Sequence, residues 1–206
     1  MTWSRLRGDR GSTLPLYIWL TGMLLFISLA FFAFAQAASA RNGAQSAADA
    51  AALAAAQATR DELVDGLGQA ITTGEGDDWL DWLDGAVATP DGEAEAAADA
   101  LAAENDSHVS GFEPDEVNGY PGYWAEVTTD YTVGDSIIPG TEAKHAKAEA
   151  TAVIKPRCSL AEAADPEKVV EFMCDGDDEP IEIDPDDFDQ GDLPDASALF
   201  SVHLAD

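Results

Sequence analysis

Residues 14–35 read LPLYIWLTGMLLFISLAFFAFA, and residues 44–58 read AQSAADAAALAAAQA. The first stretch contains no charged residue, and as a helix rising about 1.5 Å per residue it spans roughly 33 Å, the thickness of a bilayer's hydrocarbon core. In the second stretch ten of fifteen residues are Ala, the strongest helix former. The two stretches predict a transmembrane helix at residues 14–36 that continues as an Ala-rich helical extension at residues 37–60.

The residues before this helix form a short basic leader, residues 1–13, with three Arg among the first ten positions. The positive-inside rule predicts a cytoplasmic N-terminus, an extracytoplasmic C-terminal domain and a single-pass protein of the cell membrane. A cleaved signal peptide is the alternative, since small-x-small patterns end at Ala35 and Ala40. The apolar run exceeds the usual length of a signal peptide's apolar region, which favours a retained membrane helix.

The segment after the apolar run carries a recognisable sequence, because residues 45–56 read QSAADAAALAAA. An Arg-Gly leader, an apolar helix and this sequence together resemble the TadE/TadG-like proteins of tight-adherence (Flp-type) pilus systems. The resemblance covers residues 8–60. It implies a non-enzymatic component of a pilus-assembly or related envelope apparatus, whose partners are other membrane proteins of that apparatus.

The residues around the possible cleavage sites differ from those of pilins that a peptidase processes. Pilins cut by a prepilin peptidase are cleaved after a Gly and usually carry Glu at the fifth mature position. Cleavage after Gly11 would place Leu16 there, and cleavage after Gly8 would place Thr13 there. The resemblance therefore points to the TadG-like branch, a minor component whose membrane helix is not typically processed.

The Ala-rich extension is the candidate assembly helix. Small side chains let the backbones of two helices approach closely, so we expect this extension to offer a groove to a partner helix; a plain rigid spacer is the alternative. The candidate positions are Ala47, Ala48, Asp49, Ala51, Leu53 and Ala55.

The remainder of the chain predicts an α+β extracytoplasmic domain. Residues 61–106 form an acidic helical segment that includes an Ala-rich helix at residues 93–104. Residues 107–157 form a β-hairpin region, because residues 123–133 and 146–155 alternate in polarity as half-buried antiparallel strands do. Residues 109–112 are a candidate third strand.

Residues 158–206 are predicted to be a Cys loop and an acidic tail. Cys158 and Cys174 are the only cysteines, and two cysteines in an exported domain suggest one disulfide. Two free thiols, or a zinc site, are the alternatives. Residues 161–172 predict a short helix, and residues 175–206, with 12 acidic and no basic side chains, predict disorder.

The charge excludes some functions. The net charge is −30, and beyond residue 60 there are 38 acidic and 5 basic residues, a field that repels nucleic acid and anionic lipid headgroups. The acidic residues at 184–192 do not have the ligand spacing of an EF-hand calcium loop. We therefore expect at most weak binding of divalent cations there. We find no catalytic motif and expect no enzyme and no cofactor. The alternative function is a membrane-anchored surface module that binds cations or basic ligands through its acidic ectodomain.

Overall fold

The computed structural model describes residues 13–73, 79–83, 93–132, 143–160, 164–176 and 179–205, without the side chain of Trp82. The basic leader before residue 13 lies outside these ranges. The described elements are α1 (Thr13–Thr73), α2 (Trp79–Leu83), α3 (Ala94–Glu104), β1 (Ser107–Val117), β2 (Tyr120–Thr132), β3 (His145–Pro156), β4 (Cys158–Leu160), β5 (Val170–Cys174), β6 (Ile181–Ile183), the 3₁₀ turns η1 (Pro185–Asp187) and η2 (Gln190–Asp192), α4 (Ala196–Leu199) and β7 (Phe200–Leu204).

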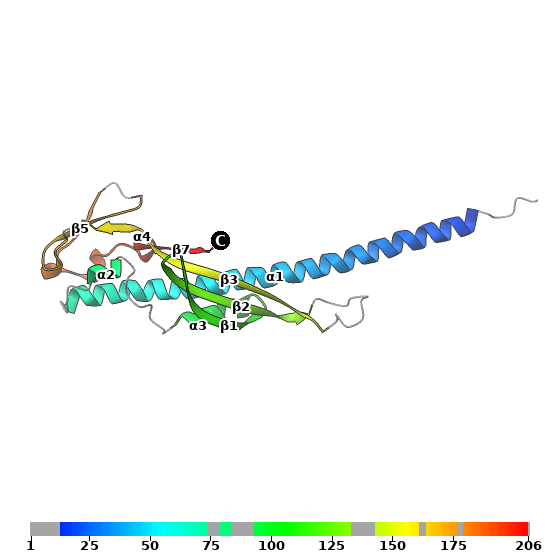
Figure 1. Cartoon of the computed structure of the whole chain (residues 1–206), viewed down its shortest axis with the longest axis horizontal. Coiled ribbons are helices and arrows are strands. Elements are labelled where there is room, and N and C mark those ends of the chain that lie inside the picture. Colours follow the sequence, from blue (N-terminus) through cyan, green and yellow to red (C-terminus); the bar gives the residue numbers. More distant parts are fainter. Residues whose placement is uncertain are drawn as a thin grey trace, which may run out of the picture.

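The longest element is α1, a single helix of 61 residues. At a rise of about 1.5 Å per residue it is roughly 90 Å long. It passes without a break through Asn42 and Gly43, where a weak point would be expected, and joins the predicted transmembrane and Ala-rich segments into one rod. All other elements gather along its C-terminal part, so its N-terminal part projects alone (Figure 1).

The main sheet has four antiparallel strands in the order β1-β2-β3-β7. The predicted pairing of β2 with β3 is confirmed, and the candidate third strand is the longer β1. Val117 pairs with Tyr120 across a two-residue turn, in which Asn118 and Gly119 have φ of 56° and 83°. Asn-Gly is a favoured sequence for such a turn, because both positions need positive φ.

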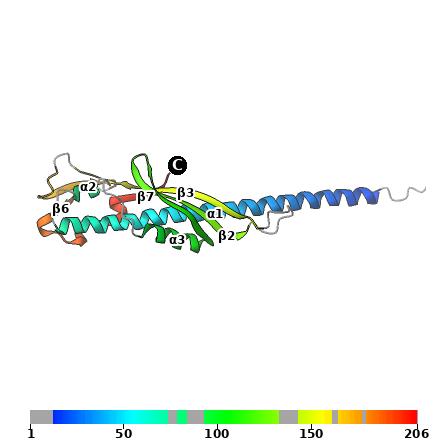
Figure 2. The same cartoon turned by 60° about the horizontal axis from the view of Figure 1, so that its bottom comes forward.

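One face of this sheet packs on α1, and α3 packs against α1 and β1 (Figure 2). The shared core combines small residues of α1 and α3 with larger ones of the strands and of the C-terminal part of α1. Its members include Ala48, Ala51 and Ala55 of α1, Ala98 and Ala102 of α3, Tyr123 and Val127 of β2, and Ile154 of β3. Fold class is thus mixed α+β, as predicted, with the long helix as the element on which the rest is built.

A second, three-stranded sheet has the order β4-β5-β6. The prediction of a helix at residues 161–172 is wrong for the residues that the structure describes, because Val170–Cys174 forms the strand β5. Its burial alternates: Val170, Phe172 and Cys174 are buried, whereas Glu171 and Met173 are exposed. This two-residue period is that of a strand with one buried face.

The prediction of a disordered acidic tail is also wrong. Residues 179–205 contain β6, both 3₁₀ turns, α4 and β7, and β7 extends the main sheet along β3. Leu199, Phe200 and Ile183 are almost fully buried, whereas every described Asp and Glu of this segment is exposed. A few buried apolar residues therefore attach this segment to the rest of the domain. Its acidic residues lie on the side that faces solvent.

Candidate functional site: the long helix and the base of the sheet

Helix α1 consists of two contrasting parts. From Thr13 to Ser39 nearly all residues are exposed, including large apolar side chains on every side of the helix, whereas buried positions begin at Ala40. The exposed apolar side chains include Leu14, Leu16, Ile18, Trp19, Leu24, Leu25, Phe26, Phe31, Phe32 and Phe34. By length and composition α1 can cross a membrane. A helix that is apolar all round needs an apolar surrounding, which the described residues of the chain do not provide for this part of α1.

The predicted assembly residues lie in the other part. Ala47, Ala48, Ala51 and Ala55 are fully buried in the core that α1 shares with the main sheet and α3, and Asp49 and Leu53 are partly buried. Small residues do permit a close approach here, but the elements that approach belong to the same chain. These alanines therefore do not form an open groove. That α1 carries assembly stays a prediction.

Two tyrosines of β2 fix the position of the sheet on α1. The Thr59 hydroxyl donates a buried hydrogen bond of 2.9 Å to Tyr123 Oη, and the Tyr123 ring stacks on Phe112. Tyr131 lies over Gly43, since a Cβ added to that glycine would stand 2.1 Å from the tyrosine hydroxyl. Gly43 is thus the site of a close contact between helix and sheet. The sequence QSAADAAALAAA, on which the family resemblance rests, begins at Gln45, two residues after Gly43. It did not predict this contact.

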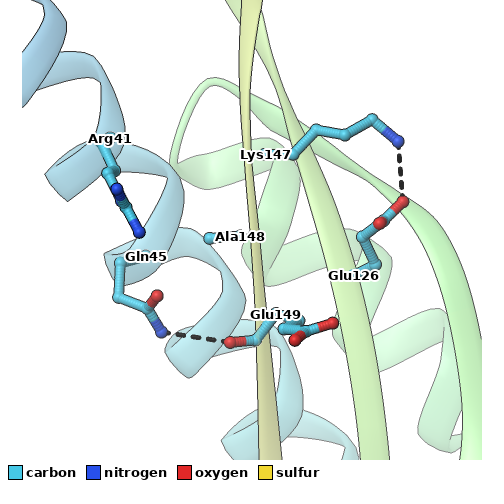
Figure 3. Close-up of a pocket in the computed structure, with 6 residues that line it drawn as sticks. All are labelled: Arg41, Gln45, Glu126, Lys147, Ala148 and Glu149. Atoms are coloured by element: carbon cyan, nitrogen blue, oxygen red, sulfur yellow. Dashed lines mark hydrogen bonds and ion pairs between the residues drawn. The ribbon is translucent and has the colours of Figure 1, made fainter.

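We call the end of the main sheet nearest the exposed half of α1 the base; Tyr131, Lys144 and His145 lie there. At the base a groove of about 420 Å³ follows the edge of β3 beside α1, lined by Arg41, Gln45, Glu126, Lys147, Ala148 and Glu149 (Figure 3). Gln45 Nε2 donates to the backbone oxygen of Glu149 at 3.2 Å and to Asp49 Oδ1 at 2.8 Å. The helix therefore satisfies a carbonyl on a strand edge that β7 does not reach.

Some charged side chains of this groove form ion pairs and others do not. Lys147 Nζ lies 2.8 Å from Glu126 Oε1, and this bond, with a second one from the Ser110 hydroxyl, lowers the pKa of Glu126. Arg41 extends beside Gln45 on the helix side of the groove (Figure 3). Among the residues that the structure describes, none forms an ion pair or hydrogen bond with Arg41 or Lys144. Both cations are exposed.

The far end of the molecule is held by covalent and polar links. The predicted disulfide between Cys158 and Cys174 is present and joins directly opposed residues of β4 and β5. Arg157 donates to the backbone oxygens of Ser197 and Asp175, both at 2.8 Å. The Cys loop and the C-terminal segment are therefore bound to each other.

The acidic stretch at residues 184–192 uses carboxylates to cap its turns. Asp184 accepts a hydrogen bond from the backbone N–H of Asp186, and Asp189 accepts one from Gly191. Within the described ranges, no group of three or more His, Cys, Asp or Glu side chains could hold a metal ion.

A comparison with family models identifies the segment that carries the exposed helix and the alanines. Residues 11–58 match the family described as putative Flp pilus-assembly TadE/G-like. The predicted resemblance is confirmed for these residues. No curated protein and no solved structure matches the chain.

The TadE/G-like segment covers about a quarter of the 206 residues. It contains the exposed half of α1 and the alanines buried under the sheet, but none of the strands. The match and the apolar helix together support a membrane component of pilus assembly. The sequence did not single out Arg41 and Lys144; a lone cation shortly after an apolar run is the signal that could have identified Arg41.

Proposed function

We propose that this protein is a non-enzymatic, single-pass minor component of a pilus-assembly or related envelope apparatus. Its N-terminus lies in the cytoplasm and its sheet domain outside. Assembly proceeds through the apolar half of α1, which inserts in the membrane and meets the helices of other apparatus proteins there.

The observation that carries this proposal is the division of α1 at Ala40. The TadE/G-like match spans this division, and the apolar side chains before it are exposed all round. Burying about 25 cal/mol per Å² of such surface in lipid supplies ample free energy for insertion. The alanines after the division already pack on their own chain, so the apolar half is the part of α1 left for intermolecular contact.

Membrane insertion and orientation are tested in cells that express the full chain. We expect the protein to resist alkaline extraction from membranes, and externally added protease to digest the sheet domain while residues 1–40 stay protected. Release by alkali would contradict insertion. Protection of the sheet domain in intact spheroplasts, with digestion after lysis, would reverse the orientation.

The route of assembly is tested by site-specific photo-crosslinking. A photoreactive residue at Leu24 or Phe31, both exposed in the apolar half, should form adducts with other membrane proteins of the apparatus. The matched control is Met173, an exposed apolar residue at the far end of the domain. Adducts from Met173 alone would assign assembly to the sheet domain.

A further inference from the structure

We propose that the base of the sheet rests on the membrane surface, where Arg41 and Lys144 bind the phosphates of anionic phospholipids. The leaflet is the one from which the domain emerges. This inference rests on the proposed membrane insertion of α1 and adds a lipid contact that insertion alone does not require.

The height of the base above the membrane follows from the unbroken helix. The apolar run ends at residue 35, and the first buried position of the domain is Ala40. Five residues of helix rise only about 7–8 Å, and the headgroup layer on each side of a bilayer is of similar thickness, about 5–7 Å. A continuous helix has no hinge that could lift the domain away. The base therefore stands at headgroup level.

The side of the base formed by β3 carries the cations. Arg41 is on the last exposed turn of α1, and Lys144 immediately precedes β3, whose tip reaches along α1 toward the exposed half (Figure 1). Neither cation has a partner among the described residues, so both are available to phosphate. Tyr131 at the same end is 39% exposed, and Tyr is favoured at membrane interfaces.

Among the residues that the structure describes, the carboxylates at the base lie mainly on the opposite side or form hydrogen bonds with neighbouring side chains. Glu104 and Asp106 end α3 and precede β1, and Asp130 lies 2.6 Å from His108 Nδ1. Glu126 is bound to Lys147. Among the described residues, Glu149 lines the groove, and the partly buried Asp49 accepts a hydrogen bond from Gln45 beside it. The attraction is thus confined to the β3 side.

The large negative charge of the domain does not cancel this attraction. The end of α1 at Thr73 lies about 48 Å along the helix from Arg41, and the Debye length at physiological ionic strength is about 8 Å. The acidic residues of the far end are therefore screened from the bilayer surface. The repulsion of anionic lipid that the total charge predicts applies to the far end, whereas Arg41 and Lys144 are exposed cations on the β3 side of the base.

The test uses the full chain in nanodiscs that contain phosphatidylcholine mixed with phosphatidylglycerol. Native mass spectrometry counts the lipids that stay bound when the disc is dissociated. We expect the unmodified protein to retain phosphatidylglycerol in excess of its share in the disc. The double variant Arg41→Gln/Lys144→Gln should reduce this preference, by roughly five-fold for each cation removed.

A matched control makes the same change in charge elsewhere. Lys155 lies at the other end of β3 and Lys168 in the Cys loop, and Lys155→Gln/Lys168→Gln should leave the preference unchanged. An equal loss in both double variants, or no preference in the unmodified protein, would overturn the lipid contact while leaving membrane insertion intact. Failure of the full chain to enter the discs would overturn both proposals.

Discussion

Single small residues decide how closely the parts of this molecule approach. At Gly122 the strand β3 comes so near that an added Cβ would stand 2.0 Å from the backbone oxygen of Ala152. The sequence placed a glycine beside the alternating strand pattern but could not reveal this contact, which depends on the register of β2 against β3. The four alanines proposed as contact sites for a partner helix are buried in the core of their own chain, and their role in assembly stays a prediction.

Gly122→Ala should destabilise the domain by about 3 kcal/mol, because two backbones would have to separate. The measurement is chemical unfolding of the full chain in detergent, followed by tryptophan fluorescence. Gly68→Ala is the control: its Cβ would meet only the flexible Gln190 side chain, at 3.4 Å, and helix propensity favours Ala by up to about 1 kcal/mol. Equal losses of stability in the two variants would contradict the role of the β2–β3 contact.

Glu126 allows a test of the groove by pH. Its pKa lies below the ordinary value of 4.5, first because of the bond from Lys147 and then because of the bond from Ser110. A lowered carboxyl pKa stabilises the folded state above about pH 4.5, and this contribution is lost as the pH falls through the lower folded value. In an NMR titration, Lys147→Ala should raise the Glu126 pKa more than Ser110→Ala does. The reverse order would show that the ion pair is not formed in solution.

At the scale of elements, periodicity and composition each predicted part of the fold. The alternating pattern predicted the pairing of β2 with β3, whereas the apolar run and the Ala content predicted α1 and α3. Composition failed for the C-terminal segment, because only a handful of its residues are buried and the acidic ones surround them in sequence. The base and its groove could not be predicted at all, since they bring together residues 41–45, 126 and 147–149 through the packing of α1 on the sheet.

Phe200→Ala should cost about 3–5 kcal/mol of unfolding free energy, as removal of a buried aromatic ring does. Phe200 is fully buried and begins β7 opposite Pro156. The control His203→Ala changes an exposed residue of the same strand and should stay within about 0.5 kcal/mol. Tolerance of Phe200→Ala would restore the earlier view of a tail that does not contribute to the fold.

For the whole molecule, the dominant feature is self-repulsion from a net charge of −30. Added salt should raise the thermal midpoint of the full chain, because screening weakens repulsion in the folded state. Sodium and calcium chloride compared at equal ionic strength separate the two functions considered for this protein. Similar increases are expected for an assembly component. A much larger increase with calcium would indicate a specific cation site and favour the cation-binding alternative.

Because α1 is one unbroken helix from the membrane to the far end of the domain, it is a lever. Transmembrane helices tilt by about 20° on average to match the local bilayer thickness. From Gly43 to Thr73 the lever arm is about 45 Å, so such a tilt swings the disulfide-linked tip sideways by roughly 15 Å. With the apolar half of α1 in the membrane, as proposed, a change in bilayer thickness or contact with a neighbouring helix would displace the far end of the domain by this distance. The direction of this displacement would depend on which side of α1 contacts the neighbouring helix.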